Sequence, residues 1–139
     1  MSAVLLDTCA LVNHVLGLPM RGGANHAIRL AQVAGSVLVP SVAATEVAQK
    51  VASGKLDLGG TSVTARLWFT RAMRLPGMVE RSVTTDIALA AYELPGPFHK
   101  DPADRLIVAM ARRLGVPVVT SDGRILAYAA LGHVRAIAC

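Results

Sequence analysis

The chain has 139 residues, a formal net charge of +5 at pH 7 and a hydrophobic fraction of 53%. This length suits one compact domain, residues 1–139, and the composition excludes a disordered chain. Charged or polar residues interrupt every long apolar run, so we expect no membrane span. The N-terminus carries no basic leader, so we expect no signal peptide and a cytoplasmic protein.

The basic residues favour nucleic acid as a partner. Eleven of the fourteen are arginine, whose planar guanidinium binds phosphate through two hydrogen bonds. Charge alone does not identify the partner, because many small proteins are basic. The two cysteines, Cys9 and Cys139, lack partners at ligand spacing and predict neither a disulfide framework nor a zinc site.

The first half of the chain alternates strands and helices. A strand is expected at residues 3–6 and a helix at 8–16, which Gly17 and Pro19 end. A second helix reaches Val33, and a short β-branched strand follows at 36–39. Ser41 is expected to cap the next helix, which runs to about residue 53.

The second half continues this alternation. After a glycine-rich loop at 55–60, a helix is expected at 61–75, a strand at 78–83 and a helix at 85–94. Beyond the loop at 95–100, Asp101 and Pro102 open the longest clear helix, which ends at Leu114. A strand at 116–120, a helix at 122–131 and a strand at 134–137 follow. This order predicts an α/β fold with a mainly parallel sheet covered on both faces.

Four carboxylates are placed where this fold could bring them together. Asp7 and Asp122 follow the ends of two predicted strands, the edge where open parallel sheets bind ligands. Asp104 borders the apolar stripe of its helix, where an unpaired carboxylate is costly. Glu46 lies on the helix after the second strand. Clustered carboxylates repel one another, so the four predict a pocket for Mg²⁺ or Mn²⁺, which could activate water for attack on a phosphodiester.

Each acid also has a simpler interpretation, and the metal site depends on their convergence. Two of them, Asp7 and Asp122, suit helix N-caps, and so does Asp101, three residues before Asp104. Glu46 could instead pair with Lys50 four residues on. No histidine is expected to act as a general base, and His99 is interpreted as a hydrogen-bonding residue of its loop.

Four segments carry a resemblance to a known family: Leu5-Leu6-Asp7-Thr8-Cys9-Ala10-Leu11, Thr45-Glu46-Val47, the stretch from His99 to Ile107, and Thr120-Ser121-Asp122. In this order they resemble PIN-domain proteins, and most of all the small toxin ribonucleases of the VapC type. The segments span almost the whole chain, and the third is quite specific. The resemblance implies a Rossmann-like α/β/α sandwich with four acids around Mg²⁺.

Carried over position by position, the resemblance implies catalytic and metal-binding roles for an acidic quartet: Asp7, Glu46, Asp104 and Asp122. Asp101 is an additional member, and Thr120 supplies a hydroxyl that shapes the site. The implied activity is Mg²⁺-dependent or Mn²⁺-dependent endoribonuclease action by the toxin of a toxin–antitoxin pair, which inhibits translation or growth. Such toxins are usually homodimers that bind their antitoxin through an apolar groove. Three basic residues beside the motifs could hold RNA phosphates: Lys100, Arg105 and Arg124.

Other classes fit the residues less well. A haloacid-dehalogenase phosphatase needs a second acid two residues after the first, where this chain has Cys9. A dinucleotide-binding domain needs a Gly-rich motif after its first strand, and a receiver domain needs a phosphoacceptor Asp near Pro40-Ser41. The serious alternative is a PIN-fold module that binds RNA or protein without cleaving it. All four acids are present, which favours the enzyme.

Overall fold

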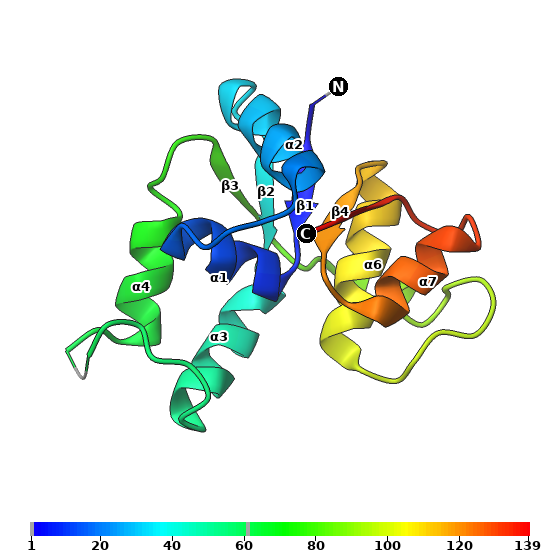
Figure 1. Ribbon diagram of the computed structural model, residues 1–139. Helices are drawn as coiled ribbons and strands as arrows, with labels where there is room; N and C mark the ends of the chain where they lie inside the picture. Colours follow the sequence, from blue (N-terminus) through cyan, green and yellow to red (C-terminus); the bar gives the residue numbers. More distant parts are fainter. Residues whose placement is uncertain (1, 61) are drawn as a thin grey trace.

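The structure is a computed structural model, and it describes residues 2–60 and 62–139. Its strands form one sheet in the order β3-β2-β1-β4-β5 (Figure 1). Their bounds are β1 (Val4–Leu6), β2 (Val37–Pro40), β3 (Met78–Arg81), β4 (Val118–Thr120) and β5 (Ala136–Ala138). Every pairing between them is parallel. The α/β fold with a parallel central sheet, predicted from the sequence, is therefore confirmed.

Helices link the strands along the chain. Their bounds are α1 (Thr8–Leu16), α2 (Gly22–Val33), α3 (Val42–Ala52), α4 (Ala65–Ala72), α5 (Thr85–Ala90), α6 (Pro102–Leu114) and α7 (Gly123–Ala130). Among the described residues, no helix combines the length and the apolar character that crossing a bilayer requires.

The central strand β1 explains why the sheet is buried on both sides. All three of its residues are buried, and successive side chains of a strand point to opposite faces. Val4 and Leu6 pack into a cluster with residues of α1, α2, α3 and α4. Leu5 points the other way, into a cluster with residues of α5, α6 and α7. Continuous apolar strands are what a parallel sheet between two helical layers requires.

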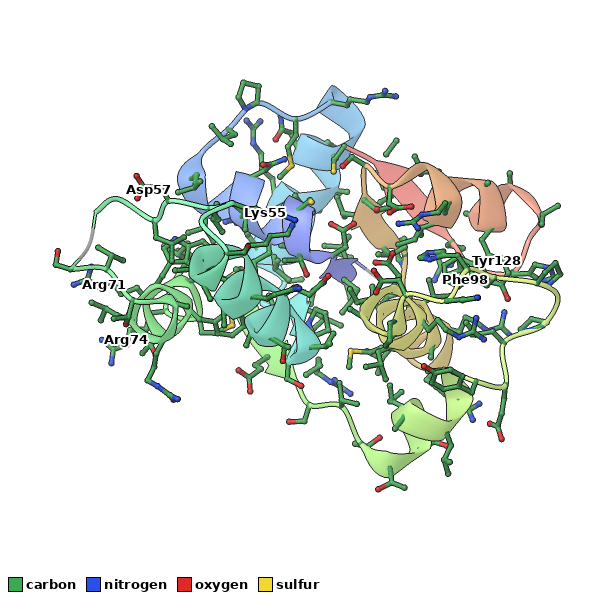
Figure 2. The ribbon with its side chains drawn as sticks, turned by 90° about the horizontal axis from the view of Figure 1, so that it is seen from below. Lys55, Asp57, Arg71, Arg74, Phe98 and Tyr128 are labelled. Atoms are coloured by element: carbon green, nitrogen blue, oxygen red, sulfur yellow. The ribbon has the colours of Figure 1, made fainter. Side chains whose placement is uncertain are left out.

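The strand ends define the edge where the site is expected. In Figure 1, β1 runs downward from the N-terminus and ends between α3 on one side and α6 and α7 on the other. Figure 2 is the view from below, toward this edge. The segments that follow β1 and β4, helix α3 and the start of α6 contribute residues to one region.

Two predicted helix starts need correction. The helix expected at 61–75 spans Ala65–Ala72, and Thr64 caps it by accepting a hydrogen bond from the Leu67 N–H at 3.1 Å; Thr61 lies outside the described residues. Ser41 precedes α3 but does not cap it with its side chain. Its Oγ accepts from the Val83 N–H at 3.0 Å, which ties the start of α3 to the segment after β3.

Other boundaries are shorter than predicted. The helix expected at 85–94 ends at Ala90, and the strand expected at 78–83 ends at Arg81. The last two strands begin at Val118 and Ala136, two residues later than expected. These differences lie at element ends, so they leave the order and direction of the strands unchanged.

Candidate active site and metal centre

The four predicted acids line one pocket at the carboxyl ends of β1 and β4. The cavity has a volume of about 240 Å³. Its lining residues are Asp7, Thr8, Cys9, Glu46, Lys50, Asp101, Asp104, Ser121, Asp122 and Arg124. Residues as distant in sequence as Asp7 and Arg124 therefore meet in one place. This convergence is what the metal-site interpretation requires.

Asp7 joins strand β1 to the pocket and is itself buried. Its Oδ1 accepts a hydrogen bond from the Ala10 N–H at 2.8 Å, so it also caps α1. Burial raises the pKa of Asp7, and the charges of Glu46 and Asp122 raise it further. Hydrogen bonds from the Thr120 hydroxyl and the Ala10 N–H oppose this rise in pKa. One carboxylate thus serves both the cap and the pocket.

Glu46 reaches the pocket from the second turn of α3 and is held there by Thr8. The Thr8 hydroxyl, buried at the start of α1, donates a hydrogen bond to Oε1 of Glu46. Within residues 2–60, where both side chains are described, Lys50 does not pair with Glu46. Its Nζ instead lies 3.8 Å from Cys9 Sγ. The alternative of a helical ion pair is therefore not realised, and Glu46 belongs to the acidic pocket.

Asp101 and Asp104 enter the pocket from the first turn of α6. Asp101 is the N-cap: its Oδ1 accepts from the Ala103 N–H at 2.9 Å and the Asp104 N–H at 3.2 Å. Pro102 occupies the first helical turn, as predicted. The capping interpretation of Asp101 is thus correct, and the same carboxylate also borders the cavity.

Asp104 has the most perturbed environment of these acids. Only 13% of its side chain is exposed. Burial raises its pKa to about 7, with further contributions from the charges of Asp101, Asp122 and Glu46, while Arg124 opposes the shift. A carboxyl with this pKa is about half protonated at neutral pH. A cation placed among these acids would favour its ionised form.

Asp122 begins α7 and contacts the Arg124 side chain. Its Oδ1 accepts from the Arg124 N–H at 2.8 Å and the Ile125 N–H at 3.2 Å. The Arg124 guanidinium donates to Oδ2 at 3.1 Å. Burial alone would raise the pKa of Asp122, but the hydrogen bonds from Arg124 and Ile125 outweigh it, so the pKa is lowered. Asp122 is consequently an ionised neighbour of the half-protonated Asp104.

Thr120 connects the two acids that follow the central strands. It is fully buried at the end of β4, and its Oγ1 accepts from the Asp122 N–H at 2.9 Å. Its hydroxyl also hydrogen-bonds the side chain of Asp7. This hydroxyl therefore fixes the geometry of the strand ends.

His99 lies closer to the acids than its interpretation as a loop residue implies. Its Nδ1 accepts from the Asp101 N–H at 3.4 Å, as expected of a loop hydrogen-bonder. Its Nε2, however, is 3.2 Å from Asp104 Oδ2. Ligand atoms of His99, Asp104 and Asp122 all lie within 4.8 Å of one another, a spacing that a metal ion could bridge. The signal in the sequence was its position on the loop entering α6, five residues before Asp104.

The tautomer of His99 argues against a ligand role. Nδ1 accepts a hydrogen bond from the Asp101 N–H and therefore carries no proton in the neutral ring. The proton is then on Nε2, the nitrogen that faces Asp104. Among the described residues Nε2 makes no hydrogen bond, although it lies 3.2 Å from Asp104 Oδ2. The burial of the ring lowers the pKa of His99, and the charge of Arg124 lowers it further. His99 is therefore a neutral neighbour of Asp104, packed beside it at the pocket.

Arg105 is predicted from the sequence to contact RNA phosphates, whereas the structure directs its guanidinium inward. Nε donates to the Ala91 carbonyl at 2.8 Å, and Nη1 donates to the carbonyls of Phe98 and His99 at 3.0 and 3.1 Å. The guanidinium carbon also lies 5.0 Å from the centre of the Tyr92 ring. These contacts hold the loop that carries His99.

The same loop is anchored from the side of α7. Phe98 and Tyr128 lie side by side in Figure 2, with ring centres 4.7 Å apart. The Tyr128 hydroxyl donates to the Pro95 carbonyl. Lys100, next to His99, is exposed and lies outside the residues that line the pocket. The loop thus offers a fixed histidine inside and a solvated lysine outside.

The donor set fits a hard divalent cation. Asp7, Glu46, Asp104 and Asp122 offer carboxylate oxygens, which Mg²⁺ and Mn²⁺ prefer. Mutual repulsion contributes to the raised pKa values of Asp7 and Asp104, and a bound cation would relieve it. Cys9 and His99 do not supply the multiple thiolate or imidazole ligands typical of zinc sites.

Comparison with solved structures places this fold among known ones. The chain is similar to a chain of VapBC2 from Rickettsia felis bound to a DNA fragment from its promoter, with 12% identity, a TM-score of 0.69 and 98% coverage of both chains. DNA-bound VapBC from Salmonella typhimurium gives 15% identity and a TM-score of 0.66, covering 99% of this chain and 98% of that chain. A toxin–antitoxin complex from Klebsiella pneumoniae gives 17% identity and a TM-score of 0.55, covering 86% of this chain and 87% of that chain. At these identities the similarity shows a shared fold.

Family membership follows from the sequence match. The model of the PIN domain family matches residues 4–131, a range that contains every acid of the pocket. The chain belongs to the PIN domain family. A search of curated protein sequences gives no match.

Proposed function

We propose that this protein is a divalent-metal-dependent endoribonuclease that hydrolyses RNA phosphodiester bonds. One observation carries the proposal: Asp7, Glu46, Asp104 and Asp122 come from separate elements and line one pocket at the carboxyl edge of a parallel sheet. Membership of the PIN domain family supports it. We expect the whole chain, residues 1–139, to form the nuclease domain.

These four carboxylates are the proposed metal ligands and catalytic residues. A bound Mg²⁺ or Mn²⁺ would supply a Lewis acid for the phosphoryl oxygen and lower the pKa of a bound water. The Thr8 hydroxyl holds Glu46, and the Thr120 hydroxyl holds Asp7 and Asp122. Asp101 fixes the first turn of α6 and borders the site.

The phosphate contacts are proposed for the exposed cations near the pocket. Arg124 lies in the pocket lining, and Lys100 stands on the loop that enters α6. A guanidinium and an ammonium both attract RNA phosphates. Arg105 is left out of this set, because three backbone carbonyls occupy its guanidinium.

We further propose that the protein is the toxin of a toxin–antitoxin pair and inhibits translation or growth. The structural neighbours are VapBC and toxin–antitoxin complexes, which supports an antitoxin as partner. A homodimer acting in the cytoplasm, where RNA is the substrate, completes this proposal. The exposed apolar residues Leu16, Leu18, Leu30 and Val33 near the ends of α1 and α2 are available to a protein partner.

The test is cleavage of a panel of tRNA, rRNA fragments and unstructured RNA with Mg²⁺ or Mn²⁺. The wild type is compared with Asp104→Asn and with Asp86→Asn, which removes an exposed acid paired with Arg113 outside the pocket. We expect metal-dependent cuts in the wild type and in Asp86→Asn, and none in Asp104→Asn. RNA binding without cleavage under either metal would instead identify a non-catalytic binding module.

A further inference from the structure

Arg124 covers two of the pocket's carboxylates from the solvent side. Its Nη2 lies 3.1 Å from Asp122 Oδ2 and 3.5 Å from Asp104 Oδ2. Its Nε lies 3.5 Å from Asp122 Oδ1. The Arg124 side chain is 60% exposed, whereas those of Asp104 and Asp122 are 13% and 24% exposed. One guanidinium therefore bridges an acid of α6 and an acid of α7 at the mouth of the pocket.

These contacts involve oxygens that a divalent ion would need. The Oδ2 atoms of Asp104 and Asp122 face the same guanidinium, so a metal ion bound to these oxygens would lie close to its positive charge. A guanidinium and a dication held by the same two oxygens would also repel each other. Binding of Arg124 and binding of a divalent ion at these oxygens should therefore exclude each other.

The local fold allows Arg124 to move without loss of structure. Its backbone N–H donates to Asp122 Oδ1 at 2.8 Å, and this bond caps α7 independently of the side chain. The side chain is long and mostly solvated, so rotation about its own bonds can turn the guanidinium outward. The released group would still stand at the pocket mouth, where an RNA phosphate has to approach the acids.

We propose that Arg124 is a built-in counter-ion, which neutralises Asp104 and Asp122 until a divalent ion displaces it and which then contacts a substrate phosphate. This inference rests on the proposed function and adds a coupling between metal binding and RNA binding through one side chain. Coupling of this kind is reciprocal, so bound RNA should also increase the affinity for the metal.

Lys50 provides a matched control for charge alone. It lines the same pocket and carries the same charge, but its Nζ contacts Cys9 Sγ rather than a carboxylate. General electrostatics predicts that removing either cation increases metal affinity by a similar factor. Displacement predicts a larger effect at Arg124, because its guanidinium contacts the proposed ligand oxygens directly, whereas Lys50 contacts Cys9.

The first experiment titrates the full-length protein with Mn²⁺, followed by electron paramagnetic resonance. We expect Arg124→Gln to bind Mn²⁺ about two- to fivefold more tightly than the wild type, a factor typical of breaking an exposed ion pair. Lys50→Gln should show a smaller change. Equal gains in the two variants, or weaker binding in Arg124→Gln, would overturn the inference.

The second experiment observes the guanidinium directly by NMR of arginine Nε–H groups during Mg²⁺ addition. The Arg124→Gln spectrum assigns the Arg124 signal, and Arg105, whose Nε donates to the Ala91 carbonyl, is the internal reference. We expect the Arg124 signal to shift and become mobile at Mg²⁺ saturation while that of Arg105 stays fixed. If Mg²⁺ binds and Arg124 does not move, this inference fails and the nuclease proposal stands. If no divalent ion binds at all, both fail.

The third experiment tests transfer to the phosphate. Binding of a phosphorothioate oligoribonucleotide, chosen to resist cleavage, is measured with and without Mg²⁺. Arg124→Gln should weaken binding several-fold with Mg²⁺ and leave it nearly unchanged without Mg²⁺. An equal loss under both conditions would show that Arg124 contacts RNA regardless of the metal, and would overturn the coupling.

Discussion

Asp104 should make the stability of the protein depend on pH in an unusual direction. Its pKa in the fold is about 7, above the value of about 3.9 for an unfolded Asp. The folded state therefore binds more protons between these values, and the contribution of Asp104 to stability is lost as pH rises from about 4 to 7. Asparagine has no proton to lose. Without divalent ions, Asp104→Asn should thus gain about 1–3 kcal/mol over the wild type at pH 8 and almost nothing at pH 4.

Urea denaturation at several pH values measures this difference. Asp86→Asn removes an acid whose side chain is 66% exposed, and it should change stability by less than about 0.5 kcal/mol at every pH. A loss of stability in Asp104→Asn at pH 8 would show that the carboxylate makes stabilising contacts that outweigh its burial.

Thr8 is expected to control metal binding without touching the metal. Its buried hydroxyl is the hydrogen-bond donor to Glu46, and loss of such supporting bonds typically costs 10–100-fold in metal affinity or activity. Thr8→Val keeps the shape and removes the donor, so we expect about a tenfold decrease in Mn²⁺ affinity with the fold retained.

The matched control for this variant is Thr45→Val, beside Glu46 on α3 but exposed. Circular dichroism checks that both variants are folded, and Mn²⁺ titration compares their affinities. Wild-type affinity in Thr8→Val would mean that Glu46 is positioned by its helix alone.

At the scale of elements, the conformation of the loop entering α6 should depend on the hydrogen bonds of Arg105. The planar fork of this residue reaches the carbonyls of Ala91, Phe98 and His99 at the same time. Lysine has the charge but not the fork. We expect Arg105→Lys to destabilise the protein by about 1–3 kcal/mol, because partly buried carbonyls lose their donors.

Urea denaturation again provides the measurement, with Arg113→Lys as the control. Arg113 is exposed and pairs only with Asp86 among the described residues, so this change should cost less than about 0.5 kcal/mol. Unchanged stability in Arg105→Lys, accompanied by weaker RNA binding, would return Arg105 to the phosphate-binding role expected from the sequence.

Local signals explain which elements the sequence predicts well. Asp101-Pro102 at the start and Gly115 at the end specify α6 to the residue, because capping and backbone geometry are decided by neighbours in sequence. Ser41 carried an equally good capping signal, yet its hydroxyl binds the N–H of Val83, 42 residues away. A partner supplied by another element is invisible to local patterns.

The pocket follows the same logic. Asp7 and Asp122 could be placed because both leave parallel strands, and such strands share their carboxyl edge. Whether Glu46 faced Lys50 or the pocket depended on the Thr8 hydroxyl of another helix. The contact of His99 with Asp104 depended on a loop held by Arg105 and Tyr128. The positions of both side chains depend on tertiary contacts with segments far away in the sequence, which local sequence patterns do not reveal.

At the scale of the whole molecule, charge is strongly segregated. Five of the nine acids line the pocket, which leaves four elsewhere, whereas only two of the fourteen lysines and arginines line it, which leaves twelve. The surface outside the pocket is therefore far more basic than the net charge of +5 suggests. Such a surface attracts RNA over a distance, while the acids remain available to cations.

This segregation predicts the salt dependence of RNA binding. Each phosphate contact on single-stranded RNA contributes about 0.7 to the slope of log affinity against log salt. In EDTA no metal-dependent cleavage occurs, so binding alone is measured. Lys100→Gln should make the slope shallower by about 0.7, because Lys100 stands beside the acidic pocket and one phosphate contact is lost. Arg71 of α4 lies on the far side of the molecule from Phe98 (Figure 2), so Arg71→Gln should leave the slope unchanged. Fluorescence anisotropy between about 50 and 300 mM KCl covers the useful range. If Arg71→Gln lowers the slope and Lys100→Gln does not, RNA follows the α4 side, and the loop entering α6 is not part of its path to the acids.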